Sequence, residues 1–304
     1  MAQRILLTGS TGFLGTHLRG FLSSQNVDIY SLGTNYHDLE NYNQIKFDEF
    51  NKLPSLLQEI KPEAIIHLAG QTNCDSLSEA FQVNVLFADA IIRSMQVSGI
   101  ENTQLLLIGS AAEYGQITSD DLPIKESLSP KPQNYYGFTK LAQTELGKWA
   151  IRSGMRVKIL RPFNIFGYQM PKHLLIQSVI EQIKQQRHSK LVNLEMGNLT
   201  TSRDFIYVTD VVRILWKLHN EPSAEGKIIN ICTGKPVQVT SILQTVEELL
   251  NIKFKISQST LLIKPNDISV HYGSTAMVDS LLGVVDLTPF KTAMENILKQ
   301  EELL

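Results

Sequence analysis

The chain has 304 residues, of which 43% are hydrophobic and 19% charged, and 28 Lys and Arg against 30 Asp and Glu leave a formal net charge of −2 at pH 7. This nearly balanced charge gives no electrostatic reason to expect DNA or RNA as a partner. The apolar content excludes a largely disordered chain, and 18 Gly and 11 Pro are too few for a low-complexity or fibrous protein. At about 150 residues per domain, the length predicts two domains or one large one.

Cysteine usage and apolar runs indicate the compartment. Cys74 and Cys232 lie far apart and lack the spacing of a metal site or a disulfide framework. We therefore expect two reduced, buried thiols and no bound metal. The apolar run Ile5–Leu7 is too short for the core of a signal peptide, and no uncharged apolar run approaches the roughly 18 residues of a membrane span. A cytoplasmic protein without a membrane partner is expected.

Short runs rich in Leu or β-branched residues alternate with stretches of helical period through the first half of the chain. Several of these runs are continuously apolar, as buried parallel strands are. The alternation predicts an α/β fold with a doubly wound parallel sheet. Strands are expected at Arg4–Thr8, Val27–Leu32, Gln44–Phe47, Ala64–Leu68, Gln104–Ile108 and Val157–Leu160.

After about residue 165 this alternation loosens. Helical period returns at Leu174–Gln186, Asp210–His219 and Ser241–Leu250, and Lys190–Met196 has the pattern of a strand. Before this point, the polar segment Gln116–Asn134 contains three prolines and is predicted to form a long surface loop.

A glycine-rich turn, Thr8-Gly9-Ser10-Thr11-Gly12-Phe13-Leu14-Gly15, follows the first predicted strand, and a helix is expected from Phe13 onward. Gly9 would permit the tight turn, Gly12 would let the backbone approach a pyrophosphate, and Gly15 would allow the helix to pack closely on the strand. The helix N-terminus would offer N–H groups and a positive dipole to phosphate. The strand before and the helix after favour a dinucleotide site over a glycine-rich turn without a ligand.

The end of the second predicted strand is where a dinucleotide-binding protein reads the adenosine ribose. The sequence there, Ser31-Leu32-Gly33-Thr34-Asn35-Tyr36, contains neither an acid for a 2′-hydroxyl nor an Arg for a 2′-phosphate. Without the acid, the site lacks the usual repulsion against NADP. We therefore favour NADPH as the cofactor, keep NADH as the alternative, and expect Thr34 and Asn35 beside the ribose.

Tyr136 and Lys140 are four positions apart, which places them on one face of a helix. A phenol with an ordinary pKa of about 10 exchanges protons poorly at neutral pH unless a cation stabilises the phenolate, and Lys140 supplies that cation. Ser110 ends the fifth predicted strand, where side chains point into the ligand crevice of an open α/β sheet. A surface Tyr–Lys pair and a Ser cap are common separately. Their conjunction favours a catalytic site.

These motifs together resemble the extended short-chain dehydrogenase/reductases that act on nucleotide sugars. The family's order and approximate intervals are kept by the glycine triplet, His67-Leu68-Ala69-Gly70, Asn84-Val85, Ser110, Tyr136 with Lys140, Arg161-Pro162-Phe163-Asn164-Ile165-Phe166-Gly167 and Arg203-Asp204-Phe205-Ile206-Tyr207-Val208-Thr209-Asp210. The resemblance covers most of the chain. It implies a Rossmann domain for the cofactor, at 1–164 and about 203–230, and a smaller, discontinuous α/β lobe for a nucleoside-diphosphate sugar, at about 165–202 and 231–304.

The resemblance also implies site residues. Those expected to bind the cofactor are Gly9, Thr11, Gly12, Phe13, Leu14, Gly15, Thr34, Asn35, Asp48 (near the adenine), Leu68, Ala69, Gly70, Asn84, Tyr136, Lys140 and Pro162. Those expected to bind the substrate are Ser110, Ala111, Glu113, Tyr136, Asn164, Arg203 and Lys264. Ser110, Tyr136 and Lys140 would be catalytic.

Three of these substrate residues have alternative interpretations or depart from the family pattern. Asn164 could cap a strand end, and Arg203 could form a surface pair with Asp204. Where most members have an Arg in an Arg-Pro-x-Asp/Glu pattern, this chain has Lys264-Pro265-Asn266-Asp267. Lysine keeps the charge but lacks the planar fork that grips a diphosphate through two bonds.

The resemblance narrows the reaction. Sugar 4,6-dehydratases carry Asp and Glu where this chain has Ala111 and Ala112, so dehydration lacks its acid and base. Epimerase-reductases use a Cys and a His beside the sugar, but no Cys lies near Ser110, and we expect His173 on the surface or in the substrate lobe.

A 4-keto reductase and a 4-epimerase that holds NAD tightly remain. The segments 108–115, 197–205 and 230–234 look most like GDP-4-keto-6-deoxy-D-mannose reductases, and Glu113 replaces the Val typical of epimerases. We therefore expect reduction of a 4-keto-6-deoxy sugar nucleotide. A non-catalytic NAD(P) sensor is a further alternative, although sensors often lose the Tyr or the Lys.

Family resemblance also implies a homodimer. The interface would lie on the helix that carries Tyr136 and on the helix from about Asn84 to Ser98. Apolar residues on these helices are Leu141, Leu146, Phe87 and Ile91, although core packing within a monomer explains them equally well.

Overall fold

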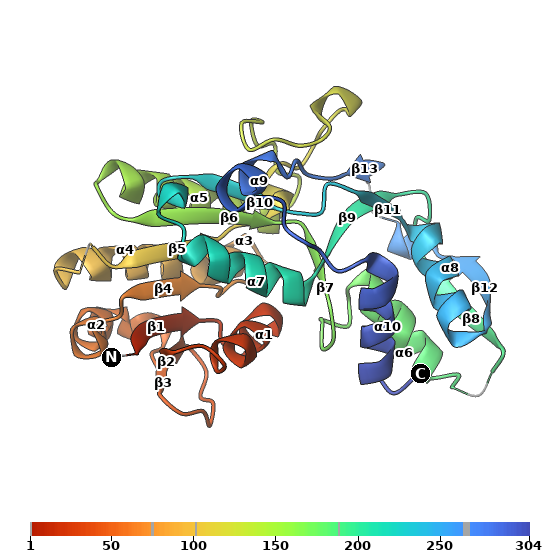
Figure 1. The fold of residues 1–304 in the computed structure, drawn as a ribbon, viewed down its shortest axis with the longest axis horizontal. Coiled ribbons are helices and arrows are strands. Elements are labelled where there is room, and N and C mark those ends of the chain that lie inside the picture. Colours follow the sequence, from red (N-terminus) through yellow and green to blue (C-terminus); the bar gives the residue numbers. More distant parts are fainter. Residues whose placement is uncertain (1, 74–75, 101, 188, 264–267) are drawn as a thin grey trace.

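A parallel sheet of seven strands forms the larger part of the molecule (Figure 1). The computed structural model describes residues 2–73, 76–100, 102–187, 189–263 and 268–304. The main sheet contains β1 (Gln3–Thr8), β2 (Val27–Gly33), β3 (Tyr42–Gln44), β4 (Ala64–His67), β5 (Gln104–Ile108), β6 (Val157–Pro162) and β10 (Ile228–Ile231). The strand order is β10-β6-β5-β4-β1-β2-β3. The chain adds β2 and β3 on one side of β1 and then β4, β5, β6 and β10 on the other side, which confirms the predicted doubly wound α/β fold.

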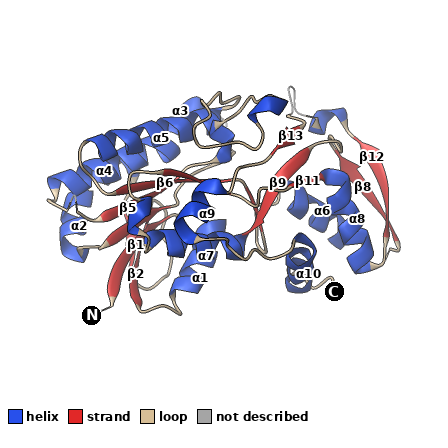
Figure 2. Ribbon diagram, turned by 45° about the horizontal axis from the view of Figure 1, so that its top comes forward, coloured by secondary structure: helices blue, strands red, loops and turns tan. Residues whose placement is uncertain are grey.

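Helices cover both faces of this sheet (Figure 2). One face carries α1 (Phe13–Leu22), α7 (Val208–His219) and α9 (Ala276–Leu282). The other carries α2 (Leu53–Ile60), α4 (Phe87–Val97) and α5 (Tyr135–Arg152), with α3 (Leu77–Phe81) and the π-helical segment η2 (Gln82–Leu86) leading into α4. Because both faces are covered, β4, β5 and β6 are buried along their whole length, which explains why most of their residues are apolar.

A smaller lobe lies beyond the carboxyl edge of the main sheet, at the right of Figure 1. Its helices are α6 (Leu175–Lys184), α8 (Val239–Leu250) and α10 (Phe290–Gln300), which share one apolar core with the parallel pair β8 (Leu191–Met196) and β12 (Lys253–Gln258). A second small sheet joins β7 (Asn164–Phe166), β9 (Ser202–Tyr207), β11 (Pro236–Gln238) and β13 (Val270–His271).

Two elements lie elsewhere than the expected domain ranges would place them. We expected β9 in the Rossmann domain, but it belongs to the small sheet, because it pairs with β7, β11 and β13. Expected in the substrate lobe, α9 packs its Val278 into the core beneath the main sheet. Chain segments therefore cross between the two parts more often than the predicted ranges allow.

The third strand was predicted at Gln44–Phe47, which is too late in the chain. It spans Tyr42–Gln44, and residues Phe47–Lys52 form a short 3-10 helix, η1, in place of a strand end. Phe47 packs edge-on against Phe50 and Phe87 in an aromatic cluster, so its side chain is anchored by α4. Tertiary packing, and not membership of a strand, therefore explains the aromatic residue at this position.

Two further expectations concern single segments. Gln116–Asn134 is largely irregular but contains the short helix η4 (Ser119–Asp121), and its Ile124 is completely buried. Cys232 is a buried free thiol, and burial raises its pKa. Cys74 lies outside the described residues.

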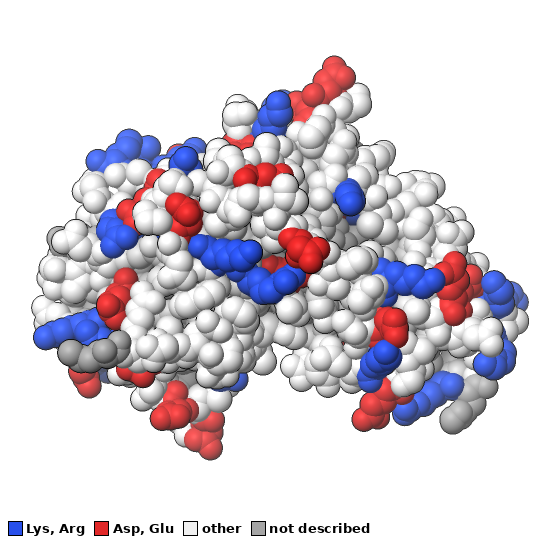
Figure 3. All heavy atoms as spheres, in the orientation of Figure 1, with Lys and Arg blue, Asp and Glu red and all other residues white. Residues whose placement is uncertain are grey.

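Acidic and basic side chains are interspersed over the face drawn in Figure 3, and the surface is notched between the main-sheet part and the smaller lobe. None of the helices in the described ranges has both the length and the apolarity to cross a membrane.

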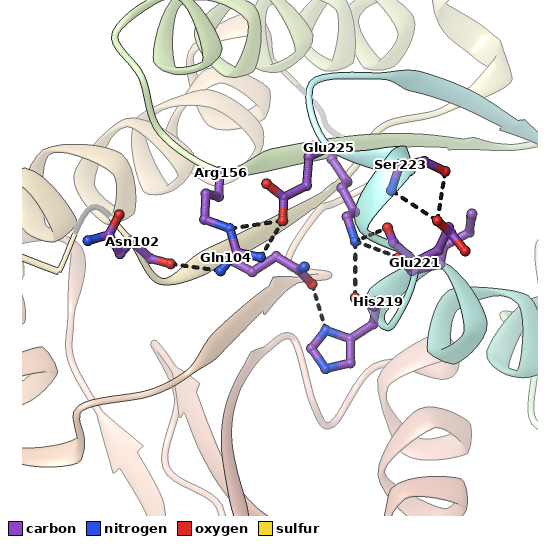
Figure 4. A network of polar contacts seen from close by, with 9 residues as sticks. Asn102, Gln104, Arg156, His219, Glu221, Ser223 and Glu225 are labelled. Atoms are coloured by element: carbon purple, nitrogen blue, oxygen red, sulfur yellow. Dashed lines mark hydrogen bonds and ion pairs between the residues drawn. The ribbon is translucent and has the colours of Figure 1, made fainter. Parts of the chain in front are cut away.

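A polar network lies at the amino edge of the main sheet and includes the buried residues Gln104, Lys158 and His219 (Figure 4). The Lys158 ammonium on β6 donates to the carbonyl oxygens of Leu218 at 2.7 Å, His219 at 3.0 Å and Glu221 at 2.8 Å. These carbonyls belong to the end of α7 and the turn after it. The Leu218 carbonyl also accepts from the Glu221 N–H at 3.2 Å, and the Glu221 carbonyl from the Ala224 N–H at 3.2 Å, so Lys158 adds a charged donor to this turn. Beside them, the His219 ring lies 2.6 Å from Gln104 Oε1. Lys158 therefore fixes the end of α7 to the sheet.

Replacing Lys158 with Met should lower the free energy of unfolding by about 2–4 kcal/mol, because the carbonyls of Leu218, His219 and Glu221 all lose the hydrogen bond from a charged donor. The exposed Lys217→Met on α7 is the matched control and should stay within about 0.5 kcal/mol of the wild type. Denaturant unfolding measures both. Equal stability of Lys158→Met and the wild type would contradict this role.

Candidate active site

The glycine-rich turn brings β1, α1 and the segment after β4 into direct backbone contact. Gly9 adopts a positive φ of 68°, and a Cβ there would lie 2.7 Å from the backbone nitrogen of Ala69. A Cβ on Gly15 would lie 2.1 Å from the carbonyl oxygen of Gly9. Only glycine fits at both positions. The turn at Gly12 opens α1, and no side chain caps its first N–H groups. These donors face the carboxyl edge of the sheet and suit a phosphate.

The loop after β2 folds back toward this turn. The Tyr42 hydroxyl donates to the Asn35 carbonyl at 2.6 Å, and the Gln44 amide donates to the Thr34 carbonyl at 3.1 Å. His37 Nε2 lies 3.4 Å from the exposed Thr11 hydroxyl. His37 was absent from the predicted site, and its only sequence signal is its position three residues after Thr34.

The strand β4 ends in a buried histidine. His67 Nδ1 lies 2.8 Å from the Thr8 hydroxyl, which also accepts from the Ala69 N–H at 3.2 Å. Burial and the nearby charge of Lys140 lower the pKa of His67 to about 3, so the ring is neutral. Thr8 and His67 together fix the chain direction from Leu68 to Gly70.

Asn84, expected to contact the cofactor, is completely buried. Its Oδ1 accepts from the Gln71 N–H at 2.8 Å, and its Nδ2 donates to the Gln71 carbonyl at 3.1 Å and to Thr139 Oγ1 at 2.9 Å. The structure thus corrects the expectation of direct contact: both amide atoms tie the segment after β4 to α5.

Ser110 follows β5 and begins the short helix η3 (Ala111–Glu113). Its Oγ accepts from the Ala112 N–H at 3.1 Å. A hydroxyl that accepts from the protein retains its hydrogen for donation to another oxygen. The predicted position at the carboxyl edge of the sheet is observed, and the local cap orients the hydroxyl.

Helix α5 begins against η3. Asn134 caps it by accepting from the Gly137 N–H at 2.8 Å, and a Cβ on Gly137 would lie 2.4 Å from the Ala112 carbonyl oxygen. This close approach sets the first turn of α5, with the half-buried Tyr136, beside the segment that carries Ser110.

Lys140 lies one turn further along α5 and is almost completely buried. Its Nζ donates to Gln143 Oε1 and lies 3.5 Å from where a Cβ on Gly70 would be, so it reaches the end of β4. Burial lowers the pKa of Lys140 to about 8, and the charge of Glu113 acts in the opposite direction. The ammonium is therefore poorly solvated and available to a partner at this edge.

Glu113, expected to contact the substrate, has no exposed surface. Its Oε2 lies 2.7 Å from Arg161 Nη2 and accepts from Arg161 Nε at 2.8 Å, while its Oε1 accepts from the Ser110 N–H at 2.9 Å. Both oxygens are used within the protein, which corrects the prediction. Sequence reasoning missed Arg161 as its partner, although an Arg within a buried apolar strand signals a buried counter-charge.

Residues expected at the substrate lobe lie along β7 and β9. The Asn164 amide donates to the Asp204 carbonyl at 2.9 Å, and Arg203 donates to the Ser202 carbonyl at 2.9 Å. A surface pair of Arg203 with Asp204 is wrong, because Asp204 is completely buried and accepts from Thr233 and Gly234.

The other predicted residues are placed as follows. Phe13 and Leu14 are half-buried on α1, Ala111 and Pro162 are buried, Asp48 is exposed in the first turn of η1, and Lys264 lies outside the described residues. Across the described ranges, no cluster of three or more His, Cys, Asp or Glu side chains could hold a metal ion.

Comparison with known proteins identifies the family. The model of the NAD dependent epimerase/dehydratase family matches residues 5–232. The chain is 30% identical to a GDP-6-deoxy-D-mannose reductase of Pseudomonas aeruginosa, covering 99% of this chain and 98% of that protein. It is 27% identical to a GDP-6-deoxy-D-talose 4-dehydrogenase of Aggregatibacter actinomycetemcomitans, covering 92% of each.

Solved structures are similar over the whole chain. The RMD protein of Pseudomonas aeruginosa complexed with NADPH matches with a TM-score of 0.86 and 28% identity, covering 99% of both chains. A UDP-glucose 4-epimerase of Thermotoga maritima matches with a TM-score of 0.85 and 17% identity, covering 98% of both, which shows a shared fold. With its glycine-rich turn and its Ser, Tyr and Lys at one sheet edge, the chain belongs to the NAD dependent epimerase/dehydratase family, whose model matches most of its length.

Proposed function

We propose that this protein is an oxidoreductase that uses NAD(P)H to reduce the C4 keto group of a nucleoside-diphosphate 4-keto-6-deoxyhexose, in deoxysugar biosynthesis for cell-surface glycans. The observation that carries the proposal is the meeting of Ser110 and the Tyr136–Lys140 helix at the sheet edge where the uncapped N-terminus of α1 also lies. The similarity to a GDP-6-deoxy-D-mannose reductase over nearly the whole chain supports the substrate class.

The residues at this edge fit a dinucleotide. A side chain at Gly9 or Gly15 would fill the space where the turn and helix pack, and the first N–H groups of α1 have no side-chain acceptor. When bound, the dinucleotide supplies the hydride. The protein's own residues then have to orient the sugar and deliver a proton to the oxygen on C4.

Each catalytic side chain has a distinct task in this proposal. The Tyr136 hydroxyl donates its proton to the developing alkoxide, and Ser110 donates a hydrogen bond to the same oxygen, which stabilises charge in the transition state. The Lys140 ammonium favours the phenolate that Tyr136 leaves behind and holds the ribose beside the nicotinamide. Its burial strengthens this interaction because little water competes for the charge.

The substrate contacts are proposed from position. Asn164 would reach the sugar with the amide atoms that its bond to Asp204 leaves over, and Arg203 and Lys264 would meet the diphosphate or nucleoside. His173 lies in the segment between β7 and α6. Its Nε2 is 3.5 Å from the hydroxyl of Thr72, which follows β4 of the main sheet.

A 4-epimerase with tightly held NAD is the second candidate, because several relatives are named UDP-glucose 4-epimerases. The two reactions share Ser, Tyr and Lys and differ in whether the cofactor leaves after one hydride transfer. NADPH is favoured over NADH because the segment at the end of β2, residues 31–36, contains no acid to accept from a ribose 2′-hydroxyl. The proposed reaction and the reduced thiol of Cys232 suit the cytoplasm.

Tyr136→Phe should lower kcat by about 100-fold or more, because the positioned acid is lost. Dinucleotide binding should persist, since the glycine-rich turn is unchanged. Steady-state kinetics with a 4-keto sugar nucleotide and fluorescence titration of NADPH measure the two effects. Turnover at the wild-type rate in this variant would refute the assigned role.

A panel of GDP-, dTDP-, UDP- and CDP-4-keto-6-deoxy sugars with NADPH and NADH should show net oxidation of the cofactor with one preferred base, and NADPH should have the lower KM. NMR of the products gives the configuration at C4. Interconversion of sugars with no net cofactor oxidation would select the epimerase.

We also propose a homodimer. Phe87 and Ile91, expected at the interface, are buried in the monomer core, so that part of the prediction is corrected. Four exposed apolar residues nevertheless lie on α3, η2 and α5, which contact one another. We define the helix patch as Leu77, Leu86, Tyr135 and Phe138, which are 37%, 52%, 54% and 47% exposed. Its position over α3, η2 and α5 suits pairing with a second copy.

Asp at both Leu86 and Phe138 should convert the dimer to a monomer, because the carboxylates would be buried at the interface. Sedimentation equilibrium measures the mass, and circular dichroism verifies folding. Val284→Asp, at a residue 92% exposed outside the helix patch, is the control and should leave the mass unchanged. A double variant of unchanged mass would exclude this surface as the interface.

A further inference from the structure

The most deeply buried ion pair near the site is not part of the mechanism described above. Glu113 and Arg161 have side chains 0% and 1% exposed, and the guanidinium meets the carboxylate through two nitrogens. Such a pair contributes little net stability compared with apolar side chains of similar volume, because desolvation offsets the attraction. Because the pair lies next to Ser110 and to the helix that carries Lys140, a functional explanation is needed.

One oxygen of this carboxylate is attached to the catalytic serine. Glu113 Oε1 accepts from the Ser110 N–H, while Ser110 Oγ accepts from the Ala112 N–H. The two bonds form a capping box around η3 and fix both the backbone and the hydroxyl of Ser110. A Cβ on Gly109 would lie 2.5 Å from Glu113 Oε1, so the strand end also leaves room for this oxygen.

Arg161 anchors the other oxygen in a rigid surrounding. Its guanidinium lies 4.7 Å from the centre of the Tyr114 ring, and the Tyr114 hydroxyl donates to Asn230 Oδ1 at 2.7 Å. The Asn230 N–H in turn donates to Glu126 at 2.9 Å. The carboxylate is thus held between β5, β6 and β10, with both oxygens bonded inside the protein.

The charge of Glu113 also acts on Lys140. Helix α5 packs on η3, and Lys140 is bonded to Gln143 on the same helix. Charged and titratable groups around this place are Arg161 on β6, Tyr114 after η3, His67 on β4, Tyr136 on α5 and, further away, Glu126. Burial lowers the pKa of Lys140, and Glu113 raises it. The carboxylate therefore counters the desolvation of the ammonium.

We propose that Glu113 is a positioning residue for the proposed reduction: one oxygen fixes Ser110, and its negative charge keeps Lys140 protonated at the working pH. The inference rests on the proposed function for its effect on turnover. Its electrostatic part stands on the structure alone. Glu113 does not touch the substrate, so it acts through Ser110 and Lys140.

Glu113→Gln tests the proposal with two readouts. In ¹³C-lysine NMR, with the Lys140 signal assigned by its loss in Lys140→Met, the titration midpoint of Lys140 should move to lower pH. The Lys158 signal is the internal reference and should not move. In kinetics, kcat should fall about tenfold with little change in KM, because positioning in the transition state is lost. The alkaline limb of the kcat/KM profile should move to lower pH, because without the carboxylate the coupled pair of Tyr136 and Lys140 should lose its first proton at a lower pH.

Glu126→Gln is the matched control, because it removes a carboxylate that accepts from a backbone N–H in the same surroundings but contacts neither Ser110 nor Arg161. Its Lys140 midpoint should equal that of the wild type. A Lys140 midpoint unchanged in Glu113→Gln, or shifted equally in Glu126→Gln, would overturn the proposal.

If Glu113→Gln does not fold, Glu113→Asp serves instead. It should keep the Lys140 midpoint but lower kcat, because the shorter side chain cannot reach both Ser110 and Arg161. Wild-type kcat in Glu113→Asp would overturn the positioning role. Wild-type protein that oxidises no NADPH with any keto sugar would refute the proposed function, and the lysine titration would still decide the inference.

Discussion

Close backbone contact at the carboxyl edge of the main sheet is the constraint on which the site depends. Gly9 lies against Ala69, Gly15 against Gly9, and Gly137 against Ala112, each at a distance that excludes a Cβ. These contacts bring α1 and α5 to the ends of β1, β4 and β5. A helix terminus suited to phosphate, a serine and a tyrosine–lysine pair can then lie at one edge of the sheet. A side chain at any of these positions would move a helix and separate the groups.

Buried polar groups do the remaining positioning. The amide of Asn84 links the segment after β4 to α5, the hydroxyl of Thr8 links β1 to β4, and the carboxylate of Glu113 links η3 to β6. Each is internally bonded, so none is an orphan that would destabilise the fold by about 1–3 kcal/mol. The result is a cationic Lys140 in a poorly solvated place, where its charge acts strongly on neighbours.

Local patterns in the sequence were sufficient for the fold and for the central site. Continuous apolar runs predicted the strands, and the glycine spacing with Ser110, Tyr136 and Lys140 predicted the carboxyl-edge crevice, because strand and helix periods fix which side chains share an edge. Contacts between distant segments were not predictable in this way. Glu113 was expected to contact the substrate from the family resemblance, whereas its partner Arg161 lies 48 residues further along the chain.

The same limit explains the other differences. Phe87 and Ile91 were expected at an interface from the family resemblance, with core packing as the alternative. Helical period alone does not distinguish a face that packs on the sheet from one that meets a second copy. The end of β3 was extended to Phe47, whose side chain is held by α4. His37 reaches Thr11 only because the loop after β2 folds back, and loop conformation leaves little trace in a single sequence.

The most direct measurement follows the hydride. The protein would be incubated with NADPH carrying deuterium at C4 of the nicotinamide and with a 4-keto-6-deoxy sugar nucleotide, and the product would be analysed by NMR and mass spectrometry. The account predicts one deuterium at C4 of the sugar from one face of the nicotinamide, with one NADP⁺ released for each product. Product without deuterium at C4, or no product from any nucleotide sugar although the dinucleotide binds, would contradict it.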